Sequence, residues 1–138
     1  MKSKLKIALL LFVFAGLTIV EFDSCKKYPD GPSFTLRTRT HRVAGTWRVE
    51  NYKVNGTDYT SLVTDYTETY SKDGNYSYSW GSLAGTGTWT FENNDEEIQI
   101  SGVSNQDDHR LFIMKLEEKS FWYYYMDGSD RKEVHLIQ

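Results

Sequence analysis

Aromatic residues recur at even spacing on both sides of the short segment Lys72-Asp73-Gly74. They are Tyr66, Tyr70, Tyr76, Tyr78 and Trp80. A period of two is typical of a β-strand that buries one face. A three-residue loop with Gly74 in the left-handed conformation pairs Tyr70 with Tyr76 and puts all five rings on one face, whereas a two-residue loop divides them between opposite faces. We therefore predict a β-hairpin over residues 65–80 with the longer turn.

The chain after residue 42 keeps the same character. Thr, Tyr, Trp and Val favour strands, Gly, Asn and Asp mark the turns, and no long helical period interrupts them. The predicted strands cover residues 45–54, 65–71, 75–80, 88–93, 97–101, 110–117, 120–126 and 131–138, with Gly81–Gly87 as a turn region. Short strands joined by short turns indicate an all-β fold, an eight-stranded up-and-down antiparallel meander that closes as a barrel or packs as a sandwich.

The first 24 residues differ in composition from the rest of the chain. Lys2, Lys4 and Lys6 precede an uncharged apolar run of 14 residues, 7–20. A membrane-spanning helix needs about 20 residues, so this pattern is typical of a secretory signal peptide. We expect residues 1–24 to be that peptide and the protein to be exported. The only cysteine, Cys25, follows directly, and an unmodified free thiol there is the alternative interpretation.

Ser24-Cys25 resembles the lipobox of bacterial lipoproteins, although Phe22 and Asp23 depart from its pattern. The resemblance implies cleavage before Cys25, attachment of acyl chains such as palmitate to that residue, and a protein held on a membrane of the cell envelope, on its periplasmic face or at the cell surface. Several acyl chains anchor stably where one does not. Residues 25–42 are then the anchor cysteine and a flexible linker. Its basic residues contact anionic head groups or, as we favour, form a solvated spacer.

Gly45-Thr46-Trp47 opens the first predicted strand and resembles the G-x-W motif of the lipocalin superfamily. Residues 43–138 are similar to the small lipocalin-like domains of bacterial lipoproteins. The resemblance implies that Trp47 plugs the closed end of a barrel, that a late arginine, here Arg131, covers it, and that the open end holds an apolar ligand. A barrel of eight strands is just wide enough to be filled by its own side chains or to hold one small ligand, so a filled core is the alternative.

Several kinds of chemistry lack support in the sequence. The formal net charge of −3 gives no basis for binding nucleic acid. No serine occupies a nucleophile elbow, and no glycine loop precedes a helix to bind phosphate. We interpret Asp107-Asp108-His109 as a solvated loop, because one such triplet lacks the ligand set of a metal site. We expect a protein that is not an enzyme, with no catalytic residues, no cofactor and no metal.

The strand Phe121–Met126 has bulky side chains on both faces. The candidates for lining a cavity with a small apolar or amphipathic ligand are Trp80, Tyr123 and Tyr125. The candidates for an outer patch, which binds a protein partner or is covered by a neighbouring segment, are Trp122, Tyr124 and Met126. The sequence thus supports two functions: a ligand-binding module on a membrane anchor, or a structural or interaction protein with a filled barrel that acts through its aromatic surface.

Overall fold

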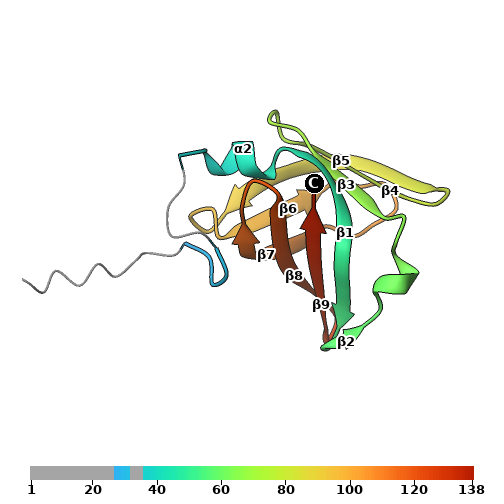
Figure 1. Cartoon of the computed structure of the whole chain (residues 1–138). Helices are drawn as coiled ribbons and strands as arrows, with labels where there is room; N and C mark the ends of the chain where they lie inside the picture. Colours follow the sequence, from blue (N-terminus) through green and yellow to red (C-terminus); the bar gives the residue numbers. More distant parts are fainter. Residues whose placement is uncertain (1–26, 32–35) are drawn as a thin grey trace, which may run out of the picture.

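The computed structural model describes residues 27–31 and 36–138, which are coloured in Figure 1. Cys25 and the predicted signal peptide lie outside these residues. The strands are β1 (Gly45–Val54), β2 (Thr57–Asp58), β3 (Thr67–Tyr70), β4 (Asn75–Trp80), β5 (Leu83–Glu92), β6 (Glu97–Ser101), β7 (His109–Leu116), β8 (Ser120–Asp127) and β9 (Asp130–Ile137). The helices in this part are a short α2 (Arg39–Val43) and a 3-10 turn, η1 (Thr60–Leu62). Neither is long and apolar enough to cross a membrane.

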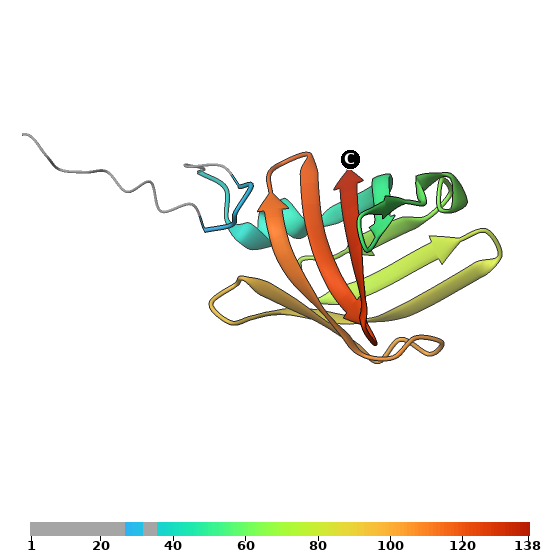
Figure 2. The same ribbon diagram turned by 90° about the horizontal axis from the view of Figure 1, so that it is seen from below.

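The strands form one closed antiparallel barrel. From β3 to β9 each strand pairs with the next in sequence, and β1 pairs with both β3 and β9, which closes a ring of eight strands. The two-residue β2 only extends β1 as a small hairpin. In Figure 2 the orange-to-red strands β7, β8 and β9 cross the direction of the yellow-green β4–β5 hairpin, as opposite walls of a barrel do. The predicted eight-stranded up-and-down barrel is confirmed.

The β3–β4 hairpin has the predicted register. Tyr70 lies opposite Tyr76, and Gly74, at φ 86°, donates its N–H to the carbonyl oxygen of Ser71 over 3.2 Å. The predicted turn region over Gly81–Gly87 is wrong, because β5 begins at Leu83 and pairs with β4 from there. Close packing explains why position 85 is a glycine, because a Cβ there would lie 2.6 Å from Cε1 of Tyr78. Glycine therefore marks a crowded strand here, not a turn.

One end of the barrel is filled. Trp47 is fully buried there, its Nε1 donates to the carbonyl oxygen of Val43 over 2.7 Å, and its ring meets Phe121 edge-on at 5.8 Å. The expectation that Arg131 covers Trp47 is wrong, because Arg131 is exposed and lies over the ring of Tyr124. A buried arginine at the filled end is Arg42 of α2, which donates to the carbonyl oxygen of Leu116 over 2.5 Å.

The segment before β1 packs onto this closed end. Tyr28 is 2% exposed and donates its hydroxyl to the carbonyl oxygen of Asp95 over 2.8 Å. Arg39 pairs with the Asp95 carboxylate, and the Thr38 side chain caps α2 by accepting from the N–H of His41. Tyr28, Gly31, Arg42 and Val43 are buried on the barrel, which differs from the flexible, solvated spacer expected, whereas residues 36–38 are exposed. Burial of the Tyr28 ring supplies the reason.

Candidate functional site

A cavity of about 1100 Å³ occupies the end of the barrel opposite α2. Its wall consists of the last residues of β1, β4 and β8 and the first residues of β3, β5, β7 and β9. The segment 59–63 and the loop 105–108 complete the rim. Cavities that hold a small molecule usually measure about 300–1,000 Å³. This end of the barrel is therefore wide enough for a ligand, while the other end is not.

All three side chains predicted to line a cavity do line it. Tyr123 is buried deep inside, Tyr125 is partly buried, and Trp80 stands half-exposed at the mouth. Met126, predicted for the outer patch, also lines the cavity. It can do so because β8 ends at the mouth, where the chain turns at Asp127 and Gly128 and a side chain of either face reaches the rim.

The floor of the cavity contains a residue that we did not single out from the sequence, Glu68. It is only 3% exposed and accepts hydrogen bonds from four tyrosine hydroxyls. Tyr66 and Tyr123 each donate to Oε1 over 2.8 Å, Tyr76 donates to the same oxygen over 3.3 Å, and Tyr70 donates to Oε2 over 2.7 Å. The sequence feature that could have identified Glu68 is the alternation of side chains in β3, which puts Glu68 between Tyr66 and Tyr70 on the inward face.

These hydrogen bonds allow a carboxylate to remain buried. A charge removed from water must be hydrogen-bonded or paired, and no ion pair joins Glu68 to a cation among the described residues. Burial, and then the negative charge of Glu68, raise the pKa of Tyr70 and of Tyr123 well above the ordinary value. The phenols therefore keep their protons and remain donors at neutral pH.

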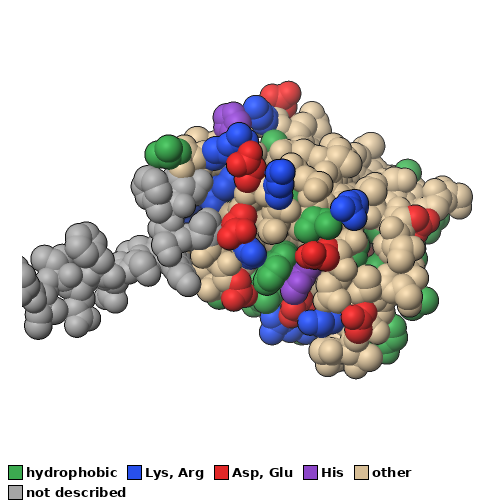
Figure 3. Space-filling view, viewed as in Figure 1, with side chains coloured by type: hydrophobic (Ala, Val, Ile, Leu, Met, Phe, Trp, Pro, Cys, Tyr) green, Lys and Arg blue, Asp and Glu red, His purple; other side chains and the backbone are tan. Residues whose placement is uncertain are grey.

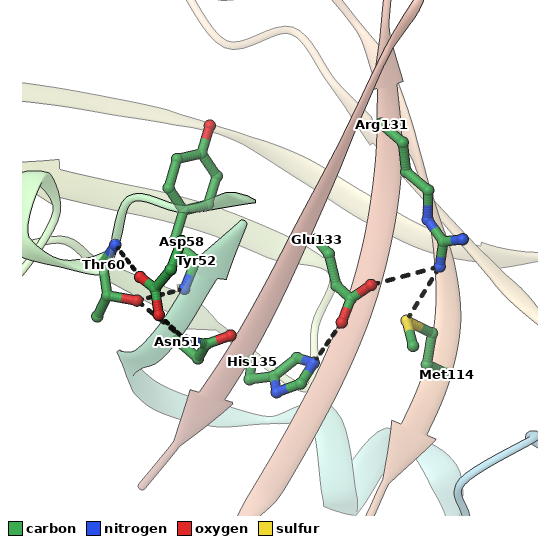
Figure 4. Close-up of polar contacts among 8 residues, drawn as sticks. All are labelled: Asn51, Tyr52, Asp58, Thr60, Met114, Arg131, Glu133 and His135. Atoms are coloured by element: carbon green, nitrogen blue, oxygen red, sulfur yellow. Dashed lines mark hydrogen bonds and ion pairs between the residues drawn. The ribbon is translucent and has the colours of Figure 1, made fainter. Parts of the chain in front are cut away.

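A polar network holds the rim between β1 and η1 in place, as Figure 4 shows. The amide of Asn51 donates to Asp58 over 3.0 Å and to the hydroxyl of Thr60 over 3.1 Å. The backbone N–H of Thr60 donates to Asp58 over 2.8 Å, and this bond lowers the pKa of Asp58. The network fixes a segment whose apolar side chains, Tyr59 and Leu62 among them, border the cavity.

Acidic side chains outnumber basic ones around the cavity. The carboxylates in its lining are those of Glu68, Asp107, Asp108 and Asp127. Among the described residues, Lys132 is the one Lys or Arg side chain in the lining, and it pairs with Asp127. The other three carboxylates of this described wall form no ion pair with Lys or Arg, which favours a negative potential in the cavity.

The predicted outer patch is overlaid by its neighbours. Trp122 stacks on the His135 ring at 4.1 Å, and the Nζ of Lys115 lies 4.4 Å from the Trp122 ring centre. Arg131 lies over Tyr124 at 4.1 Å, and Figure 4 shows Glu133 between Arg131 and His135. Figure 3 accordingly shows basic and acidic side chains interspersed on this face, with few apolar ones.

The loop between β6 and β7 holds Asp107 and Asp108, and β7 begins directly after them at His109. Asp108 accepts the N–H of Gly102 over 2.9 Å, and Nδ1 of His109 lies 3.0 Å from the carbonyl oxygen of Asp107. These bonds shape the loop itself. In the part of the chain that the structure describes, no three His, Cys, Asp or Glu side chains converge as a metal site would require.

The sequence matches no known family profile, and it finds no counterpart among curated proteins.

Proposed function

We propose that this protein is a lipid-anchored protein of the cell envelope whose lipocalin-like barrel binds a small apolar or amphipathic ligand. The observation that carries the proposal is where the exposed apolar side chains lie. In residues 27–31 and 36–138, six large apolar side chains are exposed, and five of these line the cavity: Tyr59, Leu62, Trp80, Leu83 and Met126. Apolar surface gathered around a concavity is typical of a ligand site.

The division of the barrel into two halves supports the same proposal. At the α2 end, large side chains such as Trp47, Tyr70 and Phe121 are fully buried and fill the interior. At the other end, rings stand around an open volume with polar groups at its floor, so an apolar body and a polar group can be accommodated together. The alternative function, through the outer aromatic surface, has less support because Lys115, His135 and Arg131 overlie Trp122 and Tyr124.

Binding can be tested on the purified full chain with the neutral fluorescent probe N-phenyl-1-naphthylamine. We expect saturable binding, with energy transfer from tryptophan to the probe. Trp80→Ala removes an aromatic wall and should weaken binding by about 1–2 kcal/mol, roughly 5- to 30-fold. Trp122→Ala is the matched control, because it removes the same side chain from the outer surface. Absence of binding to the wild type, or equal loss in both variants, would contradict the proposal.

The anchor needs a separate test, because Cys25 lies outside the described residues. The full chain should be expressed in a bacterial host that is fed an alkyne analogue of palmitate. Wild-type protein should carry the label and sediment with membranes, whereas Cys25→Ser should carry none. Equal labelling of the two proteins would refute the assignment of Cys25, and an unlabelled wild type would refute lipidation.

A further inference from the structure

The carboxylate at the cavity floor is held by hydrogen bonds from the protein itself. A carboxylate offers about four acceptor positions. The Oε1 atom of Glu68 accepts from Tyr66, Tyr123 and, more weakly, Tyr76, but Oε2 accepts from Tyr70 alone. The four hydroxyl donors thus match the acceptor positions, and they leave the charge of the carboxylate in place. Because Glu68 belongs to the cavity lining, this charge borders the space for a ligand.

Among the described residues, no ion pair gives the negative charge of Glu68 a counter-charge. Tyrosine hydroxyls stabilise an anion by their dipoles but bring no positive charge. The lining adds Asp107 and Asp108, while Lys132 is held by Asp127 at the rim. Coulomb attraction is stronger in a partly desolvated cavity than in water, so the site favours a ligand that carries positive charge.

The cavity walls suit such a ligand in a second way. Tyr66 and Tyr78 are stacked with ring centres 6.0 Å apart, and the rings of Trp80 and Tyr125 also border the space. Aromatic faces attract ammonium groups through the negative charge density of the ring. A cation–π contact of this kind is present at the rim, where the Nζ of Lys132 lies 5.8 Å from the centre of the Tyr125 ring.

We infer that the cavity selects a small organic cation, an amine or quaternary ammonium group on an apolar body, with its charge directed to Glu68 and its body against the aromatic wall. This inference rests on the proposed function and narrows its ligand class. A neutral ligand uses the same walls but leaves the charge of Glu68 uncompensated. An anionic ligand is opposed by three carboxylates of the lining.

The test uses three probes of similar shape, 2-phenylethylammonium, 2-phenylethanol and phenylacetate. Their affinities for the purified full chain are measured at pH 7 by calorimetry and by displacement of N-phenyl-1-naphthylamine. We expect the cation to bind at least tenfold more tightly than the alcohol, and phenylacetate to bind most weakly. The preference for the cation should decrease as salt is raised from 50 mM to 500 mM.

Variants test which residues cause the preference for the cation. Glu68→Gln keeps the size and an acceptor oxygen but removes the charge, and it should reduce the preference for the cation to less than threefold while 2-phenylethanol still binds. Glu50→Gln is the matched control, because Glu50 is exposed on β1 and lies outside the cavity lining. If Glu68→Gln does not fold, the double variant Asp107→Asn/Asp108→Asn on the rim should lower the preference two- to threefold.

The outcomes separate this inference from the proposed function. If N-phenyl-1-naphthylamine binds and the three probes displace it equally, the cavity binds ligands without charge selection and the inference is overturned alone. If N-phenyl-1-naphthylamine does not bind, the proposed function fails and the inference fails with it. A preference for the cation that survives both Glu68→Gln and the rim variant also overturns the inference.

Discussion

Replacement of Tyr70 by Phe isolates one hydrogen bond to the buried carboxylate. The Tyr70 hydroxyl is the donor to Oε2 of Glu68, at 2.7 Å, and Tyr70 is 1% exposed. Phenylalanine retains the ring contacts with Trp89 and Phe121 at 5.8 and 5.7 Å, so the packing should change little. A hydrogen bond to a charged group contributes about 1.5–3 kcal/mol. We expect Tyr70→Phe to lower the free energy of unfolding by about 2 kcal/mol, or the Tm by roughly 10 °C.

Urea unfolding of the full chain, followed by tryptophan fluorescence, measures this loss. Tyr78→Phe is the matched control, since Tyr78 is also buried in the barrel but its hydroxyl donates to none of the described residues. It should cost less than about 0.5 kcal/mol. A double-mutant cycle of Tyr70→Phe with Glu68→Gln should give a coupling of at least about 1 kcal/mol. Equal losses in Tyr70→Phe and Tyr78→Phe would refute the view that Glu68 is held as a hydrogen-bonded anion.

Three further predictions concern the barrel itself. Trp47→Ala should lower the free energy of unfolding by about 3–5 kcal/mol, because the ring is fully buried at the closed end; a loss below about 1.5 kcal/mol in urea would contradict that role. Gly85→Ala should lower the free energy of unfolding by about 1–3 kcal/mol in the same assay, since its Cβ would lie 2.6 Å from Tyr78. An unchanged urea midpoint would contradict this, because it would show that the Tyr78 ring can move aside without cost. Unfolded tyrosines ionise near pH 10, whereas the pKa of Tyr123 is raised well above 10.0 in the fold. The unfolded state therefore loses protons first, and stability should fall as pH rises above about 10. Absorbance at 295 nm should then report tyrosine ionisation together with unfolding, and gradual ionisation of the folded protein would contradict it.

The hairpin over β3 and β4 was predictable because its information is local. Side chains with a period of two and one glycine in the left-handed conformation determine the register without reference to the rest of the chain. The extent of β5 was not predictable in this way. Gly85 and Gly87 look like turn residues until the side chains that approach them, Tyr78 and Val103, are known.

The cavity was partly predictable. The alternation in β8 puts Tyr123 and Tyr125 on one face, and the structure places both in the cavity lining together with the third candidate, Trp80. The role of Glu68 depends on Tyr123, which is 55 residues away in the sequence. The burial of Tyr28 depends likewise on Asp95, 67 residues away. Contacts over such separations arise only once the barrel has closed, and local patterns do not encode them.

The packing of Tyr28 has a consequence for how the barrel would stand on a bilayer. Tyr28 is fixed at the closed end, and three residues of extended chain reach at most about 11 Å. If Cys25 carries the proposed acyl chains, that end must rest close to the lipid head groups. Trp80 and Leu62 would then face the aqueous compartment, on the side away from the lipid. A ligand would arrive by diffusion through water rather than by lateral transfer from the membrane, which favours molecules that are soluble as well as apolar.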